Sequence, residues 1–170
     1  KQSLGTLRTQ AVASNHTDVI TRIDVALEVL TLFEQDIARI YSFFDPLFMA
    51  QLTVPQAEDY LAQYQAKQAP IAAKVDNLPS EPLFDDKGLM KRLLGEEEAA
   101  FKEAVLDARY NELLVPFRGI AYNSYPLNDF KVLLENFKAA LPALEAKAKA
   151  FGLEDYWKDH TNVLATGHIS

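Results

Sequence analysis

"NHTDVITRIDVALEVLTLFEQDIARIYSFF", residues 15–44, carries apolar side chains at steps of three and four. This spacing places them on one face of an α-helix, and we expect that face to point into a core. Asp45 and Pro46 end the helix, because the residue before a proline is pushed out of the helical backbone region. At about 1.5 Å per residue, the helix is about 45 Å long. The predicted core positions are Ile20, Ile23, Leu27, Leu30, Phe33, Ile37, Ile40 and Phe44.

A second helix is predicted over residues 53–78. Thr53 is suited to cap its first turn, Pro55 is tolerated there, and Gln56 occupies the reciprocal position of a capping box. The amide of Gln68 interrupts the apolar stripe and needs hydrogen-bond partners if it is buried. The stripe consists of Ala57, Leu61, Tyr64, Gln68, Ile71, Val75 and Leu78.

The prolines, glycine and turn-forming residues of segment 77–88 predict a loop, followed by a short helical piece to residue 94. A third helix is predicted to begin at Glu96, Glu97 and Glu98, because acidic residues in a first turn meet the positive end of the helix dipole. Two stripes follow, which predicts burial on two sides of the helix. One contains Phe101, Val105 and Ala108, and the other contains Leu106, Tyr110, Leu113 and Phe117.

A fourth helix is predicted over residues 128–151, with Asn128 as its cap. Lys147 and Lys149 suit the negative end of the helix, and Gly152 suits the left-handed position that follows it. Its apolar set is Phe130, Leu134, Phe137, Leu141, Leu144, Ala148 and Phe151. A final short helix over about residues 154–165 is expected to fold back on the others.

Four long amphipathic helices with modest connections bury their stripes best in a bundle. We therefore predict an all-α fold, an antiparallel four-helix bundle with kinked helices plus a short C-terminal helix, in a single domain spanning residues 1–170. Three of the long helices contain an internal proline, namely Pro70, Pro116 and Pro142. An internal proline bends a helix because it removes one backbone hydrogen bond. The alternative that each proline begins a new short helix stays open.

The stretch "PFRGIAYNSYP", residues 116–126, is the leading candidate for a binding site. In the simpler interpretation it is a kinked helix end followed by a tight link to the next helix. In the functional interpretation, Arg118 holds a carboxylate or phosphate group in a cleft at the end of the bundle. The predicted ligand-binding residues are Tyr64, Tyr110, Arg118, Tyr122 and Tyr125.

Composition narrows the functional classes. The net charge is −7 and no cluster of basic residues is present, so nucleic acid is not an expected partner. No run of residues approaches the about 18 apolar positions of a membrane span. The absence of cysteine removes disulfides and thiolate chemistry, and it is compatible with a cytoplasmic or a periplasmic or exported location. The sequence leaves the compartment open.

Motifs for catalysis or cofactors are missing from the sequence. His16, His160 and His168 are not preceded by glutamate at the spacing that places a di-metal ligand pair on one helix face. The six glycines never form a phosphate loop, a dinucleotide fingerprint or a nucleophile elbow. We therefore expect no metal, no cofactor and no enzymatic activity. An enzyme whose carboxylates and histidine are assembled only by folding remains a less favoured alternative.

Two functions remain in competition. The first is a non-catalytic bundle that binds a protein partner through a helical face, with Tyr156 and Trp157 as candidate contacts because such residues dominate interface hot spots. The simpler interpretation of these two residues is that they anchor the last helix. The second function is a sensory or small-ligand-binding bundle with an interhelical pocket near Pro116.

Overall fold

The computed structural model describes residues 1–81, 85–117 and 127–165, with side chains described up to residue 159 and from residue 128 in the last segment. Within these ranges the chain is helical and contains no strand, so the predicted all-α class is confirmed. The helices are α1 (Gln2–Ala13), α2 (Thr17–Ser42), α3 (Pro46–Gln51), α4 (Val54–Asp76), α5 (Asp86–Leu114), α6 (Leu127–Ala150) and α7 (Glu154–Ala165), with a 3-10 turn η1 (Val115–Phe117) after α5.

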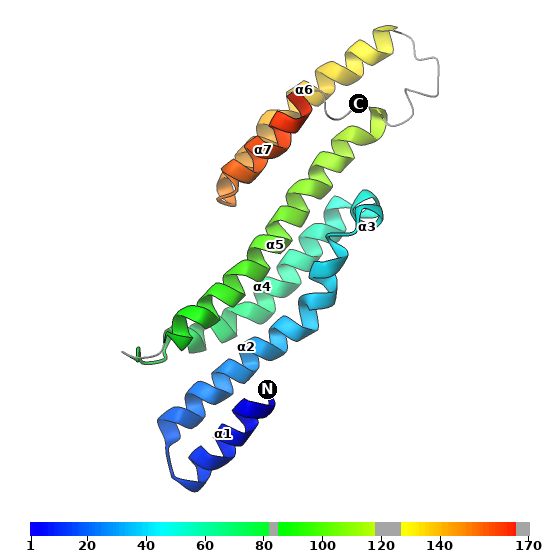
Figure 1. Ribbon diagram of the computed structural model, residues 1–170. Coiled ribbons are helices and arrows are strands. Elements are labelled where there is room, and N and C mark those ends of the chain that lie inside the picture. Colours follow the sequence, from blue (N-terminus) through cyan, green and yellow to red (C-terminus); the bar gives the residue numbers. More distant parts are fainter. Residues whose placement is uncertain (82–84, 118–126, 166–170) are drawn as a thin grey trace.

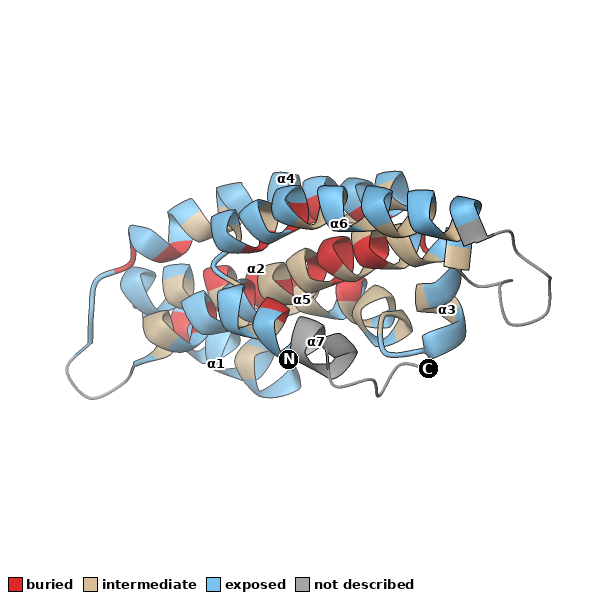
Figure 2. Cartoon of the chain, turned by 90° about the horizontal axis from the view of Figure 1, so that it is seen from above, coloured by how far each residue is buried: buried red, intermediate tan, exposed pale blue. Residues whose placement is uncertain are grey.

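The four long helices run in alternating directions, and α5 is shared by two groups of helices (Figure 1). Over residues 90–108, one side of α5 packs against α2 and α4. Along its C-terminal half it packs against α6, which in turn contacts α7. Helix α1 packs against α2, and α3 packs against α5. Figure 2 shows that the buried residues lie toward the middle of the packed helices, while the outer turns are exposed.

Buried side chains form two clusters, one on each side of α5. The first contains Phe101, which is fully buried and lies edge-on to Phe43 at 5.4 Å between ring centroids. The second is centred on Tyr110, whose ring meets that of Trp157 edge-on at 5.7 Å. Edge-to-face pairs of this kind add about 0.5–1.5 kcal/mol to the burial of the rings. The two stripes predicted for the third helix are therefore confirmed as two buried faces.

Several local predictions are also confirmed. Thr53 Oγ1 accepts a hydrogen bond from Gln56 N, and Gln56 Oε1 accepts one from Thr53 N at 3.0 Å, which completes the predicted capping box. Gly152 has a φ of 72° and ends α6 in the left-handed conformation that favours glycine. Lys147 and Lys149 lie in the last turn of α6, where positive charge is stabilised.

The predicted start of the third helix is wrong. α5 begins at Asp86, and the Asp85 side chain caps it by accepting from Gly88 N at 3.1 Å. Residues 96–98 therefore lie inside the helix rather than in its first turn. The helix continues through Gly95, because packing of Leu94 and its neighbours on α4 outweighs the about 1 kcal/mol by which glycine disfavours a helix.

Two short helices were missed by the sequence patterns. In α1 the apolar side chains do not gather on one stripe, since Leu7 and Val12 are each 50% exposed and Ala11 is buried. Helix α3 spans only six residues, too few for a period to show. Its start at Pro46 fits a proline in a first turn, and the Asp45 side chain caps it by accepting from Leu47 N at 3.0 Å.

The internal prolines do not divide the helices. α4 continues through Pro70 and α6 continues through Pro142, so the alternative of new short helices after breaks is wrong at these two positions. α5 instead ends at Leu114, just before Pro116, and passes into the 3-10 turn η1. The predicted continuation of this helix through Ile120 and Ala121 lies outside the described residues.

The predicted core face of α2 is confirmed at Ile23, which is buried, and at Ile40, which packs against the first cluster, but the part between them requires a correction. The residues that enter the first cluster are Val25, Val29 and Leu32, and they are followed on the same face by the buried Asp36. Leu30, Phe33 and Ile37 of the predicted stripe are only half-buried and belong to neither cluster. Both sets have helical spacing, so periodicity alone does not distinguish them.

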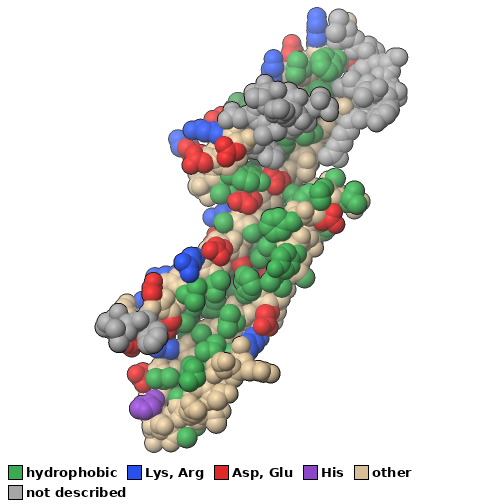
Figure 3. Space-filling model, in the orientation of Figure 1, with side chains coloured by type: hydrophobic (Ala, Val, Ile, Leu, Met, Phe, Trp, Pro, Cys, Tyr) green, Lys and Arg blue, Asp and Glu red, His purple; other side chains and the backbone are tan. Residues whose placement is uncertain are grey.

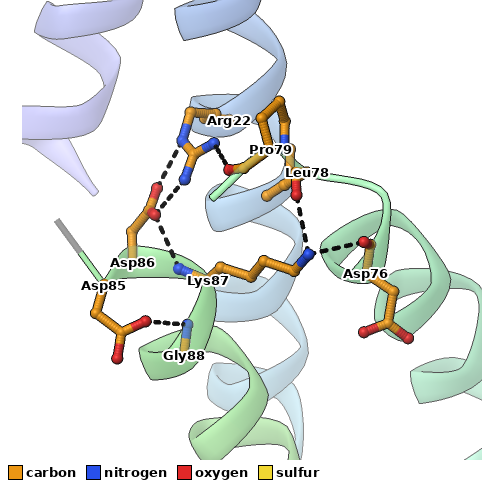
Figure 4. A network of polar contacts seen from close by, with 8 residues as sticks. All are labelled: Arg22, Asp76, Leu78, Pro79, Asp85, Asp86, Lys87 and Gly88. Carbon is orange, nitrogen blue, oxygen red and sulfur yellow. Dashed lines mark hydrogen bonds and ion pairs between the residues drawn. The ribbon is translucent and has the colours of Figure 1, made fainter. Parts of the chain in front are cut away.

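A polar network ties together one end of α2, α4 and α5 (Figure 4). The Arg22 guanidinium donates to both carboxylate oxygens of Asp86 and to the carbonyl of Pro79. Lys87 Nζ donates to the carbonyls of Asp76 and Leu78 at 2.8 and 2.9 Å, and so satisfies acceptors at the C-terminal end of α4. These bonds hold residues 76–79, at the end of α4, against α2 and the first turn of α5.

We predict that Asp86→Asn lowers the free energy of unfolding by about 1–2 kcal/mol at pH 7, since it weakens charge-assisted bonds to a largely buried Arg22. Asp76→Asn, which removes the exposed pair with Lys91, is the control and should have no measurable effect. Urea denaturation followed by circular dichroism measures both. Equal effects would contradict the assigned role of Asp86.

The difference between wild type and Asp86→Asn should also depend on pH. Hydrogen bonding by Arg22 lowers the pKa of Asp86 below its ordinary value. A carboxyl group of this kind stabilises the fold above its unfolded pKa of about 3.9, and this stabilisation is lost as the pH falls through the folded value. The difference should therefore be constant above pH 5 and shrink below pH 4.

Candidate functional site

The half-buried stripe of α2 continues into a strongly exposed apolar surface. Tyr41, Phe44 and Leu47 are 66%, 73% and 75% exposed, respectively. Figure 3 shows hydrophobic side chains running as a band over the region that α2 and α3 occupy in Figure 1. We call this surface the outer face. It consists of Leu30, Phe33, Ile37, Tyr41 and Phe44, together with Leu47 of α3.

Helix α1 covers the beginning of α2 but not the outer face at its C-terminal half. Along α1, Arg8 pairs with Asp24 at 2.7 Å, and Lys1 pairs with Glu34 at 2.8 Å. The two helices therefore run antiparallel, and the first residue of the chain lies beside Glu34. Tyr41 lies about two turns beyond that point on α2, and Phe44 follows the end of the helix.

Helix α3 adds Leu47 to the outer face because its opposite side is held by the core. Phe48 and Met49 pack against the first cluster, and the Asn111 side chain donates to the Met49 carbonyl at 3.1 Å. With these residues turned inward, Leu47 points away from the core and is exposed. The chain thus presents large apolar side chains on consecutive turns where solvent reaches them.

A separate groove lies where α3 and the start of α4 meet the end of α5. It encloses about 370 Å³ and lies beside Pro116, the region in which the sequence predicts a ligand pocket. Its lining is largely apolar, with Asn111 and Glu112 as polar groups on one wall. The lining residues are Ala50, Gln51, Leu52, Thr53, Val54, Ala108, Asn111, Glu112, Val115 and Pro116.

The residues predicted to bind a ligand are not brought together where the structure describes them. Tyr64 is buried in the first cluster, and its hydroxyl donates to the Leu94 carbonyl at 2.7 Å. Tyr110 is buried in the second cluster. Neither lines the groove beside Pro116. Arg118, Tyr122 and Tyr125 lie outside the described residues, so their predicted role stays a prediction.

Tyr156 and Trp157 contribute to packing within the chain. Trp157 is 5% exposed in the second cluster. The Tyr156 hydroxyl donates to the Asp107 carboxylate at 2.8 Å and so fixes α7 to α5. These contacts fit the interpretation of both residues as the anchor of the last helix. They leave Trp157 little surface to offer a partner protein.

Two acidic side chains are buried in the first cluster. Asp36 of α2 is 1% exposed and Glu97 of α5 is 2% exposed. Lys67 Nζ lies 3.4 Å from Asp36 Oδ1, and Arg39 Nη1 lies 3.7 Å from the same oxygen. The sequence pattern did not reveal this pair, because three acidic residues at 96–98 are typical of a helix start. The signal was present, since Glu97 lies three residues after the buried Leu94 and four before the buried Phe101.

Burial raises the pKa of the Glu97 carboxyl to about 7. The negative charge of Asp36 contributes to this rise in the pKa, whereas the ammonium of Lys67 opposes it. A hydroxyl proton directed from Tyr64 to Glu97 would also lower it, but the Tyr64 proton is given to the Leu94 carbonyl. Among the described residues, no group of three or more His, Asp or Glu side chains is placed to hold a metal ion.

Comparisons with known proteins add no constraint on function. No family model matches the chain, and no significant match was found among the curated proteins or the solved structures. None of the described helices combines the length and apolar composition needed to cross a membrane.

We predict that the outer face contributes little to folding. Phe44→Ser and Leu47→Ser should each change the free energy of unfolding by less than about 0.5 kcal/mol, because both side chains are already solvated. Phe101→Ala should cost about 3–5 kcal/mol, because it opens a cavity in the core. Chemical denaturation measures all three. A loss above about 2 kcal/mol for Phe44→Ser would show that this residue is structural.

Proposed function

We propose that the chain is a non-catalytic helical domain that binds a protein partner through the outer face. The exposure of Tyr41, Phe44 and Leu47 is the observation that carries this proposal. Burying apolar surface yields about 25 cal/mol per Å², so three large side chains left in water represent a substantial unused driving force for association. Contiguous apolar surface with aromatic residues at its centre is typical of interaction sites.

The shape of the outer face favours a helix as the docking element. From Leu30 to Tyr41 the face extends about 17 Å along α2, which matches about three turns of a partner helix, and Phe44 lies just beyond the end of α2. The packing of α1 along α2 shows that an antiparallel helix can lie on this side of α2. An amphipathic helix with apolar residues at spacings of three, four and seven fits such a surface.

Charge favours a different protein over a second copy of this chain. The net charge is −7, so two copies repel one another at low salt. The outer face is followed by the exposed Asp45 and bordered by Glu34, an exposed carboxylate that Lys1 pairs with at 2.8 Å. We therefore propose that the outer face binds an amphipathic helix of another protein, with basic residues beside the apolar stripe of that helix.

A second candidate function rests on the groove beside Pro116. Its volume of about 370 Å³ is at the lower end of the range for small-molecule sites. Asn111 and Glu112 would offer polar groups for hydrogen bonding to a largely apolar ligand at one wall of the groove. A ligand in this groove should raise the melting temperature of the native chain but not that of Val115→Trp, which fills the groove from its exposed rim.

Site-specific photo-crosslinking tests the proposed partner site. A benzophenone side chain replacing Phe44 or Leu47 should form one heteromeric adduct in cells of the source organism. The same group at Val132, which is 54% exposed on α6, is the control and should form none. Adding Tyr41→Glu should reduce the adduct at residue 47 at least about tenfold, because it buries a charge in the interface.

Two outcomes of this experiment would contradict the proposal. Adducts of equal yield at residues 44 and 132 would indicate nonspecific contact. An adduct of twice the chain mass, with matching self-association in sedimentation, would indicate a second copy of this chain as the occupant.

A further inference from the structure

Asp36 and Glu97, the two acidic residues buried in the first cluster, have a property that is separate from partner binding. We propose that Asp36 and Glu97 form a proton-binding site in the core, and that the proton held there links the stability of the bundle to pH near neutrality. The site lies between α2 and α5 and is bordered by α4, the three helices that build the first cluster.

Hydrogen bonding around the pair is incomplete for two ionised carboxylates. Within the described part of the chain, neither oxygen of Glu97 and only one oxygen of Asp36 has a polar partner. A buried carboxylate without hydrogen bonds or a counterion is costly, and such a group takes up a proton instead. The geometry thus accommodates one charge at Asp36 and a neutral carboxyl at Glu97.

The surrounding charges support this assignment from all three helices. On α2, Arg39 lies near Asp36 but is paired through its guanidinium with Gln63 at 2.9 Å. On α4, Lys67 lies beside Asp36 with 40% of its side chain exposed. Its positive charge therefore offsets the charge of Asp36 but not a second charge on Glu97. On α5, Glu98 adds a further negative charge, although Lys102 pairs with it at 3.3 Å.

Tyr64 offers a partner for the neutral form of Glu97. Its hydroxyl has a single proton, which goes to the Leu94 carbonyl. Toward Glu97 it therefore presents lone pairs, which can accept a hydrogen bond from a protonated carboxyl and repel an ionised one. Burial and the charge of Glu97 accordingly raise the pKa of the Tyr64 phenol, so this group stays protonated at neutral pH.

The sign of the pH effect follows from the raised pKa of Glu97. The pKa of an unfolded glutamate is about 4.3, whereas burial raises the pKa of folded Glu97 to about 7. Between these values only the folded state holds the proton. Stability is therefore greatest at the acidic end of this window and falls as the pH rises toward and through 7. Above this window, the fold must accommodate buried negative charges on both Asp36 and Glu97.

The direct test is a carboxyl-carbon NMR titration of Glu97 in the full chain. The wild-type midpoint should lie near pH 7. Asp36→Asn should lower it, because a repelling charge is removed, and Lys67→Gln should raise it, because an attracting charge is removed. Shifts of opposite sign from these two substitutions are not expected from a general loosening of the core. A wild-type midpoint near 4.5, or shifts in the same direction, would overturn the proposal.

Denaturation provides the matching stability measurement. The urea midpoint of the wild type should fall between pH 5 and pH 8, and that of Glu97→Gln should stay flat. Glu98→Gln, which changes the adjacent and more exposed residue, is the control and should keep the wild-type decline. A decline of equal size in Glu97→Gln, or a flat wild-type profile, would contradict the proposal. If Glu97→Gln does not fold, the NMR titrations of the wild type and of Lys67→Gln decide whether the proposal holds.

Discussion

The packing of α5 on two opposite sides is the constraint on which the rest of the structure depends. Phe101 and Val105 lie in the core that α5 shares with α2 and α4, whereas Leu106 and Tyr110 lie in the core shared with α6 and α7. Residues 105 and 106 are adjacent, so the change of side takes place within one turn. A helix buried on both sides cannot be moved without opening one of the clusters.

In the described part of the chain, this arrangement leaves the outer face of α2 beyond Glu34 without a covering helix. In a compact four-helix bundle, each helix packs against two neighbours and its apolar stripe is closed. Here the second cluster contains no residue of α2 or α4 among the residues described, because α6 packs against the far side of α5. Leu30, Phe33 and Ile37 consequently lie half-buried, and Tyr41 and Phe44 are exposed. The proposed partner site is thus a consequence of where α6 packs.

Local rules predicted the parts of the fold that depend on neighbouring residues. The capping box at Thr53, the left-handed Gly152 and the two stripes of α5 all follow from short-range spacing. The core side of α2 does not follow from short-range spacing, because this helix carries two interleaved apolar sets. Only tertiary contacts determine which set is buried. Buried Glu97 was missed for a related reason: an acidic residue beside Gly95 is typical of a helix start, and packing against α4 overrode that signal.

In this structure α2 has one apolar face in the core and another open to solvent. Paramagnetic relaxation by a soluble gadolinium chelate tests it directly, because the effect on each side-chain NMR signal reports access to solvent. Strong broadening is expected for Tyr41, Phe44 and Leu47, together with protection of Val29, Leu32 and Phe101. Equal protection of the two sets would show that the outer face is covered and would contradict the account.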